Sequence, residues 1–159
     1  MAALVGLAAG FAACRSGGTS SPAASSAPVP QALPGDIERT TFAPSLEVHL
    51  DKMLRRPSGL YMQELETGTG SVATRGRSVI VRYTAWLADG KQVDQGEITV
   101  ELGSNKTIRA WEEGLLGMRV GGRRRLVVPP ALAYGSRGGG DAIPPNAVMV
   151  FDMEVVSVL

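Results

Sequence analysis

Residues 108–114 read Ile-Arg-Ala-Trp-Glu-Glu-Gly, and they are followed by Ala-Tyr-Gly at 133–135, Ile-Pro-Pro-Asn at 143–146 and Phe-Asp at 151–152. This ordered set supplies a Trp, a Tyr and a Phe, together with a loop rich in Gly and Pro that can fold over them. The set contains no pairing of a nucleophile with a base and no cluster of metal ligands. Aromatic side chains without such chemistry indicate a pocket that works by shape and polarity.

The segments around this set alternate apolar and polar residues with the period of a β-strand. The apolar and polar faces are most distinct in residues 78–87. Tyr83 lies on the apolar face of this segment and Trp86 on the opposite face. Ile108, Trp111 and Leu115 follow the spacing of one short helix with a buried stripe. The predicted strands are residues 60–66, 78–87, 97–102, 123–128 and 149–155. Four or five antiparallel strands and one short helix predict an α+β domain, in which a curved sheet closes on the helix.

Composition excludes several classes of function. A chain of 159 residues has room for one ordinary domain and a tail. The formal net charge of +1 makes nucleic acid an unlikely main partner, and the three Arg at 123–125 are interpreted as a solvated strand face. One Cys and one His exclude an intramolecular disulfide and a Cys/His zinc site. Residues 68–73 match the glycine pattern of dinucleotide-binding loops, but loop residues follow where that motif needs a helix.

Residues 1–35 are interpreted as a targeting signal followed by a tether. Residues 2–13 form an apolar run that is too short to span a bilayer but suits a secretory signal. The run ends at Cys14 in a bacterial lipobox-like sequence, although Phe11 stands where Leu is usual and no basic residue precedes the Cys. The alternative is a fortuitous apolar terminus with a free Cys.

The predicted organisation of the chain has four parts. A signal and lipobox segment covers residues 1–14, and a disordered tether rich in Ser, Ala, Pro and Gly covers 15–35. An N-terminal extension covers 36–57, where alternation at residues 46–50 predicts an added edge strand. The main domain covers 58–159.

Taken in order, the motifs resemble those of FKBP-type peptidyl-prolyl cis-trans isomerases over residues 59–158. Besides the opening set, the resemblance rests on Gly-Thr-Gly at 68–70, Val-Arg-Tyr-Thr at 81–84, Asp-Gly-Lys at 89–91, Asp94, and Leu-Gly at 102–103. It implies a half-barrel wrapped around one short α-helix. It also implies a pocket between sheet and helix, with Trp111 as its floor and with no cofactor and no metal.

The resemblance also implies roles for particular residues. Trp111 would seat the proline ring, while the Ile108 backbone N–H and the Tyr134 hydroxyl would donate hydrogen bonds to substrate carbonyls. The implied catalytic residues are Tyr83, Asp94, Tyr134 and Phe151. The implied substrate-binding residues are Val93, Ile98, Thr107, Ile108, Trp111 and Ile143. On periodicity alone, Trp111 and Phe151 would fit an ordinary core equally well.

Three departures from the family pattern bear on catalysis. Val93 stands where the family usually has Phe, and Ile98 matches a family aromatic. The connection at residues 95–97 is about five residues shorter than the common form, so a family Arg or Lys has no counterpart. Both hydrophobic changes keep the pocket apolar but make it less aromatic.

Two functions follow from the resemblance. The first is a prolyl isomerase that assists the folding of exported proteins, acts on proline-containing unfolded polypeptides and accepts a macrolide ligand. The second is a peptide-binding or chaperone-like module with weak or no isomerase activity, which the changes at Val93 and Ile98 favour. Together with Cys14, either function predicts an exported lipoprotein held at a membrane and facing the periplasm or the cell exterior.

Overall fold

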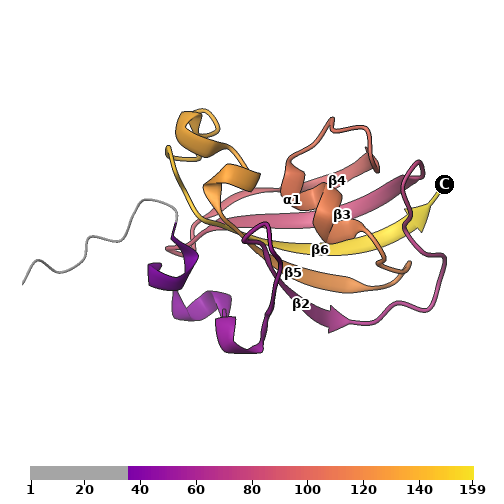
Figure 1. The fold of residues 1–159 in the computed structure, drawn as a ribbon, viewed down its shortest axis with the longest axis horizontal. Coiled ribbons are helices and arrows are strands. Elements are labelled where there is room, and N and C mark those ends of the chain that lie inside the picture. The colour runs from indigo at the N-terminus through magenta and orange to yellow at the C-terminus, as the bar shows by residue number, and fades with distance from the viewer. Residues whose placement is uncertain (1–35) are drawn as a thin grey trace, which may run out of the picture. The chain divides into compact units, whose positions relative to one another are not determined.

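The computed structural model describes residues 36–159, which form one antiparallel sheet with a short helix on one face (Figure 1). The six strands lie in the order β1-β2-β5-β6-β3-β4. They are β1 Leu54–Arg55, β2 Tyr61–Glu66, β3 Ser78–Leu87, β4 Gln92–Glu101, β5 Arg123–Val128 and β6 Met149–Val158. The helix is α1, Arg109–Leu115. The predicted α+β architecture, a curved antiparallel sheet around one short helix, is confirmed.

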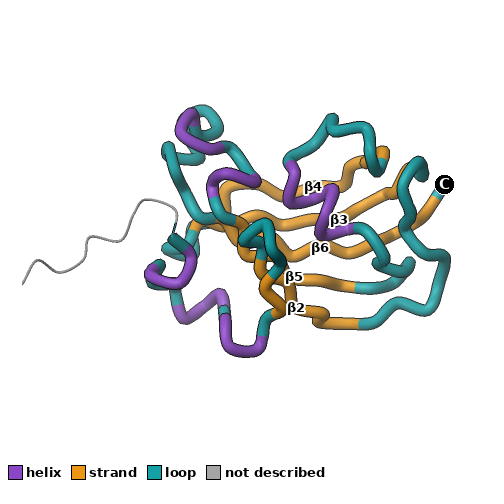
Figure 2. Tube along the Cα trace, viewed as in Figure 1, coloured by secondary structure: helices purple, strands orange, loops and turns teal. Residues whose placement is uncertain are grey.

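Short 3-10 helices occur in two regions of the described chain, before the sheet and in one loop of it (Figure 2). Three of them precede the sheet: η1 Ile37–Arg39, η2 Pro44–Leu46 and η3 Leu50–Lys52. Two more, η4 Pro130–Leu132 and η5 Gly135–Arg137, lie in the loop between β5 and β6. None of the helices in residues 36–159 has the length and apolar character needed to cross a membrane.

Helix α1 packs closely on the sheet because its buried side carries small residues. Ala110 and Gly114 are buried there beside Trp111 and Leu115. A Cβ atom added at Gly114 would lie 2.5 Å from Leu126 Cδ1 on β5, so a larger residue would push the helix away from the strand. The covered face of the sheet is the apolar face that the alternation of residues 78–87 and 149–155 predicted, and it forms the main core.

The opposite face of the sheet carries a second core. Here the N-terminal extension contributes Ile37, Leu46 and Met53, which are all buried. They pack with three residues of the strands, Tyr61, Val127 and Val150, and with Val148 just before β6 and the partly buried Trp86. Because both faces are covered by apolar side chains, the extension is part of the folded unit.

The predicted edge strand at residues 46–50 is wrong. The chain there forms two 3-10 turns, η2 and η3, and Glu47 between them adopts a left-handed conformation with φ of 48°. Pro44 opens the first turn, and a proline cannot donate to a strand ladder. The true edge strand is the two-residue β1, which pairs with β2.

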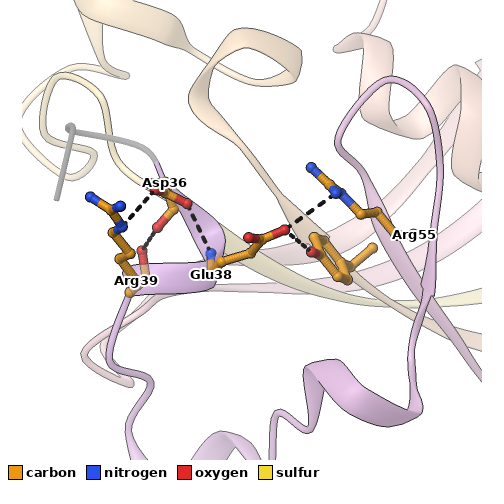
Figure 3. A network of polar contacts seen from close by, with 6 residues as sticks. Asp36, Glu38, Arg39 and Arg55 are labelled. Atoms are coloured by element: carbon orange, nitrogen blue, oxygen red, sulfur yellow. Dashed lines mark hydrogen bonds and ion pairs between the residues drawn. The ribbon is translucent and has the colours of Figure 1, made fainter.

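A polar network joins the start of the extension to the sheet (Figure 3). Asp36 caps η1 by accepting from the Glu38 N–H at 3.2 Å. Glu38 in turn accepts from the Tyr61 hydroxyl at 2.9 Å and lies 3.3 Å from Arg55. Exposed pairs of this kind stabilise little, so the network orients η1 and the second core supplies most of the stabilisation.

The three-Arg run on β5 is only partly a solvated face, which corrects the sequence-based interpretation. Arg123 is exposed, whereas Arg125 makes a two-pronged pair with Asp152 at 2.6 and 2.7 Å and also donates to the Leu46 carbonyl. Arg124, on the other face, pairs with Glu64 and donates to the Gly114 carbonyl at 2.6 Å. Alternation along the strand sends the two guanidinium groups to opposite faces, where each one ties the sheet to a neighbouring segment.

Candidate active site

A cavity of about 520 Å³ opens between α1, the strands β3, β4 and β6, and the loop that precedes β6. Nine of the ten predicted site residues line it: Tyr83, Asp94, Ile98, Thr107, Ile108, Trp111, Tyr134, Ile143 and Phe151. They come from five separate stretches of the chain, which the fold brings to one place. The predicted lipidation residue, Cys14, lies outside the described residues.

Three aromatic rings form the inner part of the cavity. Trp111, on the buried side of α1, is only 6% exposed. Its ring centroid lies 4.7 Å from that of Tyr83 on β3 and 5.7 Å from that of Phe151 on β6, both in edge-to-face geometry. Such pairs prefer this arrangement because the positive edge of one ring meets the negative face of the other. The result is a rigid apolar surface at the bottom of the cavity.

Tyr83 and Asp94 connect this apolar surface to the rim. The Tyr83 hydroxyl donates to Asp94 Oδ2 at 2.7 Å, and the Gln95 backbone N–H donates to Oδ1 at 2.8 Å. Burial, followed by the hydrogen bond to Asp94, raises the pKa of Tyr83 to about 12. Tyr83 therefore stays a neutral donor at any working pH, and the Asp94 carboxylate is held in one orientation.

Two donors at the mouth are available to a ligand. Ile108 is extended, with φ of −63° and ψ of 145°. Its carbonyl accepts a hydrogen bond from the backbone N–H of Trp111 at 3.0 Å. Its own N–H has no acceptor within residues 36–159. Tyr134 is 40% exposed, and its hydroxyl likewise has no partner in the described part of the chain. Burial and the nearby charge of Asp94 raise the pKa of Tyr134, which keeps the hydroxyl protonated.

The loop that carries Ile143 is closed by glycine. Gly139 and Ile143 exchange hydrogen bonds of 2.9 and 3.2 Å, which fold residues 138–143 back on themselves. Gly138 has φ of +67°, and a Cβ atom there would collide with the Ile143 carbonyl oxygen. Only glycine tolerates both the positive φ and the close approach of the Ile143 carbonyl, so Gly138 fixes the turn that places Ile143 at the cavity.

Val93 is the predicted site residue that does not line the cavity. It packs against the main core at an irregularity in the β3–β4 ladder, where Ala85 pairs with Asp94 and Trp86 pairs with Gln92. Val93 is thus the skipped residue of a bulge, next to Asp94 in the sequence but not part of the cavity lining.

The short connection at residues 95–97 is the middle of a strand. Gln95, Gly96 and Glu97 pair in register with Thr84, Tyr83 and Arg82, so β4 runs unbroken from Gln92 to Glu101. With no extra residues to loop out, the ladder simply continues past the cavity.

Sequence reasoning missed several residues of the wall. Ala85 and Met149 were placed only in the core by periodicity, and they line the cavity because the apolar faces of β3 and β6 continue into it. Lys106 and Arg109 flank residues 107 and 108 in the sequence and bring positive charge to the mouth. Ala131, Leu132 and Ala133, which precede Tyr134, complete the wall.

Comparisons with known proteins agree with this geometry. The profile of the FKBP-type peptidyl-prolyl cis-trans isomerase family matches residues 70–156. The FK506-binding protein of Neisseria meningitidis serogroup B is 37% identical over 105 residues, which cover 63% of this chain and 96% of that protein.

Solved structures give the same result. A peptidyl-prolyl cis-trans isomerase from Pseudomonas syringae pv. tomato aligns with a TM-score of 0.61 at 37% identity, over 67% of this chain and 80% of its own. FkpA from Escherichia coli aligns with a TM-score of 0.61 at 36% identity, over 67% of this chain and 51% of its own. The chain therefore belongs to the FKBP-type peptidyl-prolyl cis-trans isomerase family and is an enzyme of that type, as the motifs predicted.

Proposed function

We propose that this isomerase assists the folding of exported polypeptides by seating a proline ring on Trp111 while the preceding amide twists. The observation that carries the proposal is the aromatic surface of Tyr83, Trp111 and Phe151 below two donors, the Ile108 N–H and the Tyr134 hydroxyl, which have no partner among residues 36–159. The surface would hold the ring by shape, and the donors would fix substrate carbonyls on either side of the bond.

The chemistry needs no covalent step. Rotation about the peptide bond has a barrier of about 18–20 kcal/mol, because resonance gives the bond partial double-bond character. Twisting the amide removes that resonance and makes the group less dipolar, so an apolar wall favours the twisted form over the planar one. A thousandfold acceleration requires only about 4 kcal/mol of such differential binding.

The proposed ligands include proline-containing peptides and FK506-type macrolides, and both would lie on Trp111. We expect either ligand to change tryptophan emission in a Trp86→Phe variant, in which Trp111 is the remaining tryptophan. Trp86 packs in the second core on the opposite face of the sheet and should report little. Fluorescence titration of the wild type and of Trp86→Phe with either ligand checks this expectation. Ligand binding that leaves the emission of Trp86→Phe unaltered would show that Trp111 is not the floor.

We also propose that the protein is exported and anchored at a membrane through lipid on Cys14, so that it meets clients as they emerge. The support is the sequence alone: an apolar run that ends at a lipobox-like Cys and precedes a tether of small and polar residues. Several acyl chains anchor a protein stably, whereas one chain binds only marginally. We expect Cys14→Ser to move the full-length protein from the membrane fraction to the soluble fraction. Absence of incorporated fatty acid in the wild type would contradict the anchor.

A second candidate is a peptide-binding module with the same fold and little turnover. The aliphatic residues Val93, which does not line the cavity, and Ile98, which does, favour it, because both reduce the aromatic surface next to Asp94. A cis/trans exchange assay on proline peptides, with protein beginning at Asp36 so that the second core is intact, separates the two. Saturable peptide binding without acceleration of exchange would support the binding module.

A further inference from the structure

Asp94 differs from the other acidic residues of β4 in its surroundings. Glu97 lies 3.3 Å from the guanidinium of Arg82, and Glu101 lies 2.9 Å from the Lys106 ammonium. The two oxygens of Asp94 accept only from neutral groups, the Tyr83 hydroxyl and the Gln95 N–H. Among residues 36–159, no Lys or Arg lies within ion-pair distance of it.

This carboxylate is open to a ligand. Asp94 is exposed and lines the cavity, whereas Glu97 points from the other face of β4 and does not. Tyr83 contacts both Asp94, at 2.7 Å, and the Trp111 ring, with a centroid separation of 4.7 Å. Only the Tyr83 side chain therefore lies between the negative charge of Asp94 and the Trp111 ring that would hold the proline.

The positive groups of the cavity lie elsewhere in its wall. Lys106 is engaged by Glu101, and Arg109 belongs to the first turn of α1. The cavity mouth thus has a negative strand side and a positive helix side. Strand β4 continues past Asp94 without an inserted loop, and Asp94 is exposed, so a substrate side chain can approach it.

We propose that Asp94 selects substrates by charge: it favours X–Pro bonds flanked by Lys or Arg and disfavours those flanked by Asp or Glu. The inference rests on the proposed seating of proline on Trp111. A flanking residue of such a substrate emerges near Asp94, and the long stems of Lys and Arg can carry a cation to it. A neighbouring acidic residue would meet like charge. The contact is exposed, so its effect is modest and depends on salt.

The test uses peptides that share one sequence around a single proline and differ only in Lys, Gln or Glu, placed either before or after it. We expect kcat/KM for exchange to fall in the order Lys, Gln, Glu at one of the two positions. The ratio of Lys to Glu should be about fivefold at low ionic strength and approach one near 1 M salt. The neutral Gln peptide measures isomerase activity independently of the charge effect.

Three variants assign the preference to Asp94. Asp94→Asn should bring the ratio of Lys to Glu close to one, whatever happens to the absolute rate. Tyr83→Phe removes the hydrogen bond but keeps the charge, so it should preserve the ratio. Glu97→Gln removes the same charge from the same strand on the other face, and it should also preserve the ratio.

The outcomes separate the inference from the function on which it rests. If the Gln peptide is not accelerated by the wild type, the proposed function fails. If the Gln peptide is accelerated but Lys and Glu peptides react equally at both positions, the charge selection is wrong. A preference for Lys that survives in Asp94→Asn, or a preference for Glu in the wild type, would also overturn it.

Discussion

Replacing Phe151 by alanine should abolish isomerase activity and lower the free energy of unfolding by about 3–5 kcal/mol. Phe151 is 2% exposed and meets Trp111 edge-to-face across the cavity, so it serves both the core and the site. Alanine leaves a void that the rigid sheet cannot fill and removes the ring that holds Trp111 in place. Chemical denaturation measures the first effect, and an exchange assay on the folded fraction measures the second.

A matched variant separates the two roles of this ring. Phe151→Leu keeps most of the volume, so we expect a loss of stability nearer 1 kcal/mol. It still removes the aromatic edge that faces Trp111, a contact worth about 0.5–1.5 kcal/mol. Activity should therefore fall further than stability does. Full activity in a folded Phe151→Ala protein would show that the ring belongs to the core alone.

The main core and most of the candidate site could be predicted because their signals are local and periodic. Alternation along β3 placed Tyr83 toward the helix and Trp86 away from it, and the structure confirms both positions. The helical spacing of Trp111 and Leu115 likewise gave the buried stripe of α1. The family motifs then indicated which of these buried residues line a cavity, which periodicity alone cannot tell.

The errors share a physical cause, which is contact between segments far apart in the sequence. Residues 46–50 alternate like a strand, but they make other contacts. The Leu46 carbonyl accepts from Arg125 on β5, and the Leu46 side chain packs in the second core, which also contains Val127. The environment of Arg124 depends on the Gly114 carbonyl, which no local pattern shows. Val93, which the family motif implies as a site residue, stands at a bulge in the ladder and does not line the cavity, and no local pattern shows that bulge.

Leu46→Ala in the N-terminal extension should lower the free energy of unfolding by about 2–5 kcal/mol while leaving kcat/KM per folded molecule unchanged. Leu46 is 4% exposed and packs in the second core, on the face of the sheet opposite the cavity. For a domain of this size the melting temperature should fall by roughly 8–20 °C. The matched control is Leu54→Ala, since Leu54 is 60% exposed on β1 and its loss should change stability by no more than about 0.5 kcal/mol.

The comparison of these two leucines decides what the extension is. The family profile begins at Gly70, so nothing in the family match requires residues 36–53. The sheet, however, carries Tyr61, Val127 and Val150 on its outer face, and these side chains are buried because the extension covers them. If Leu46→Ala is as mild as Leu54→Ala, the extension is a loose covering and a shorter domain would suffice. If the loss is confined to Leu46→Ala, the fold of this isomerase includes a second core outside the family boundaries. Protein trimmed to those boundaries would then expose that apolar face and aggregate.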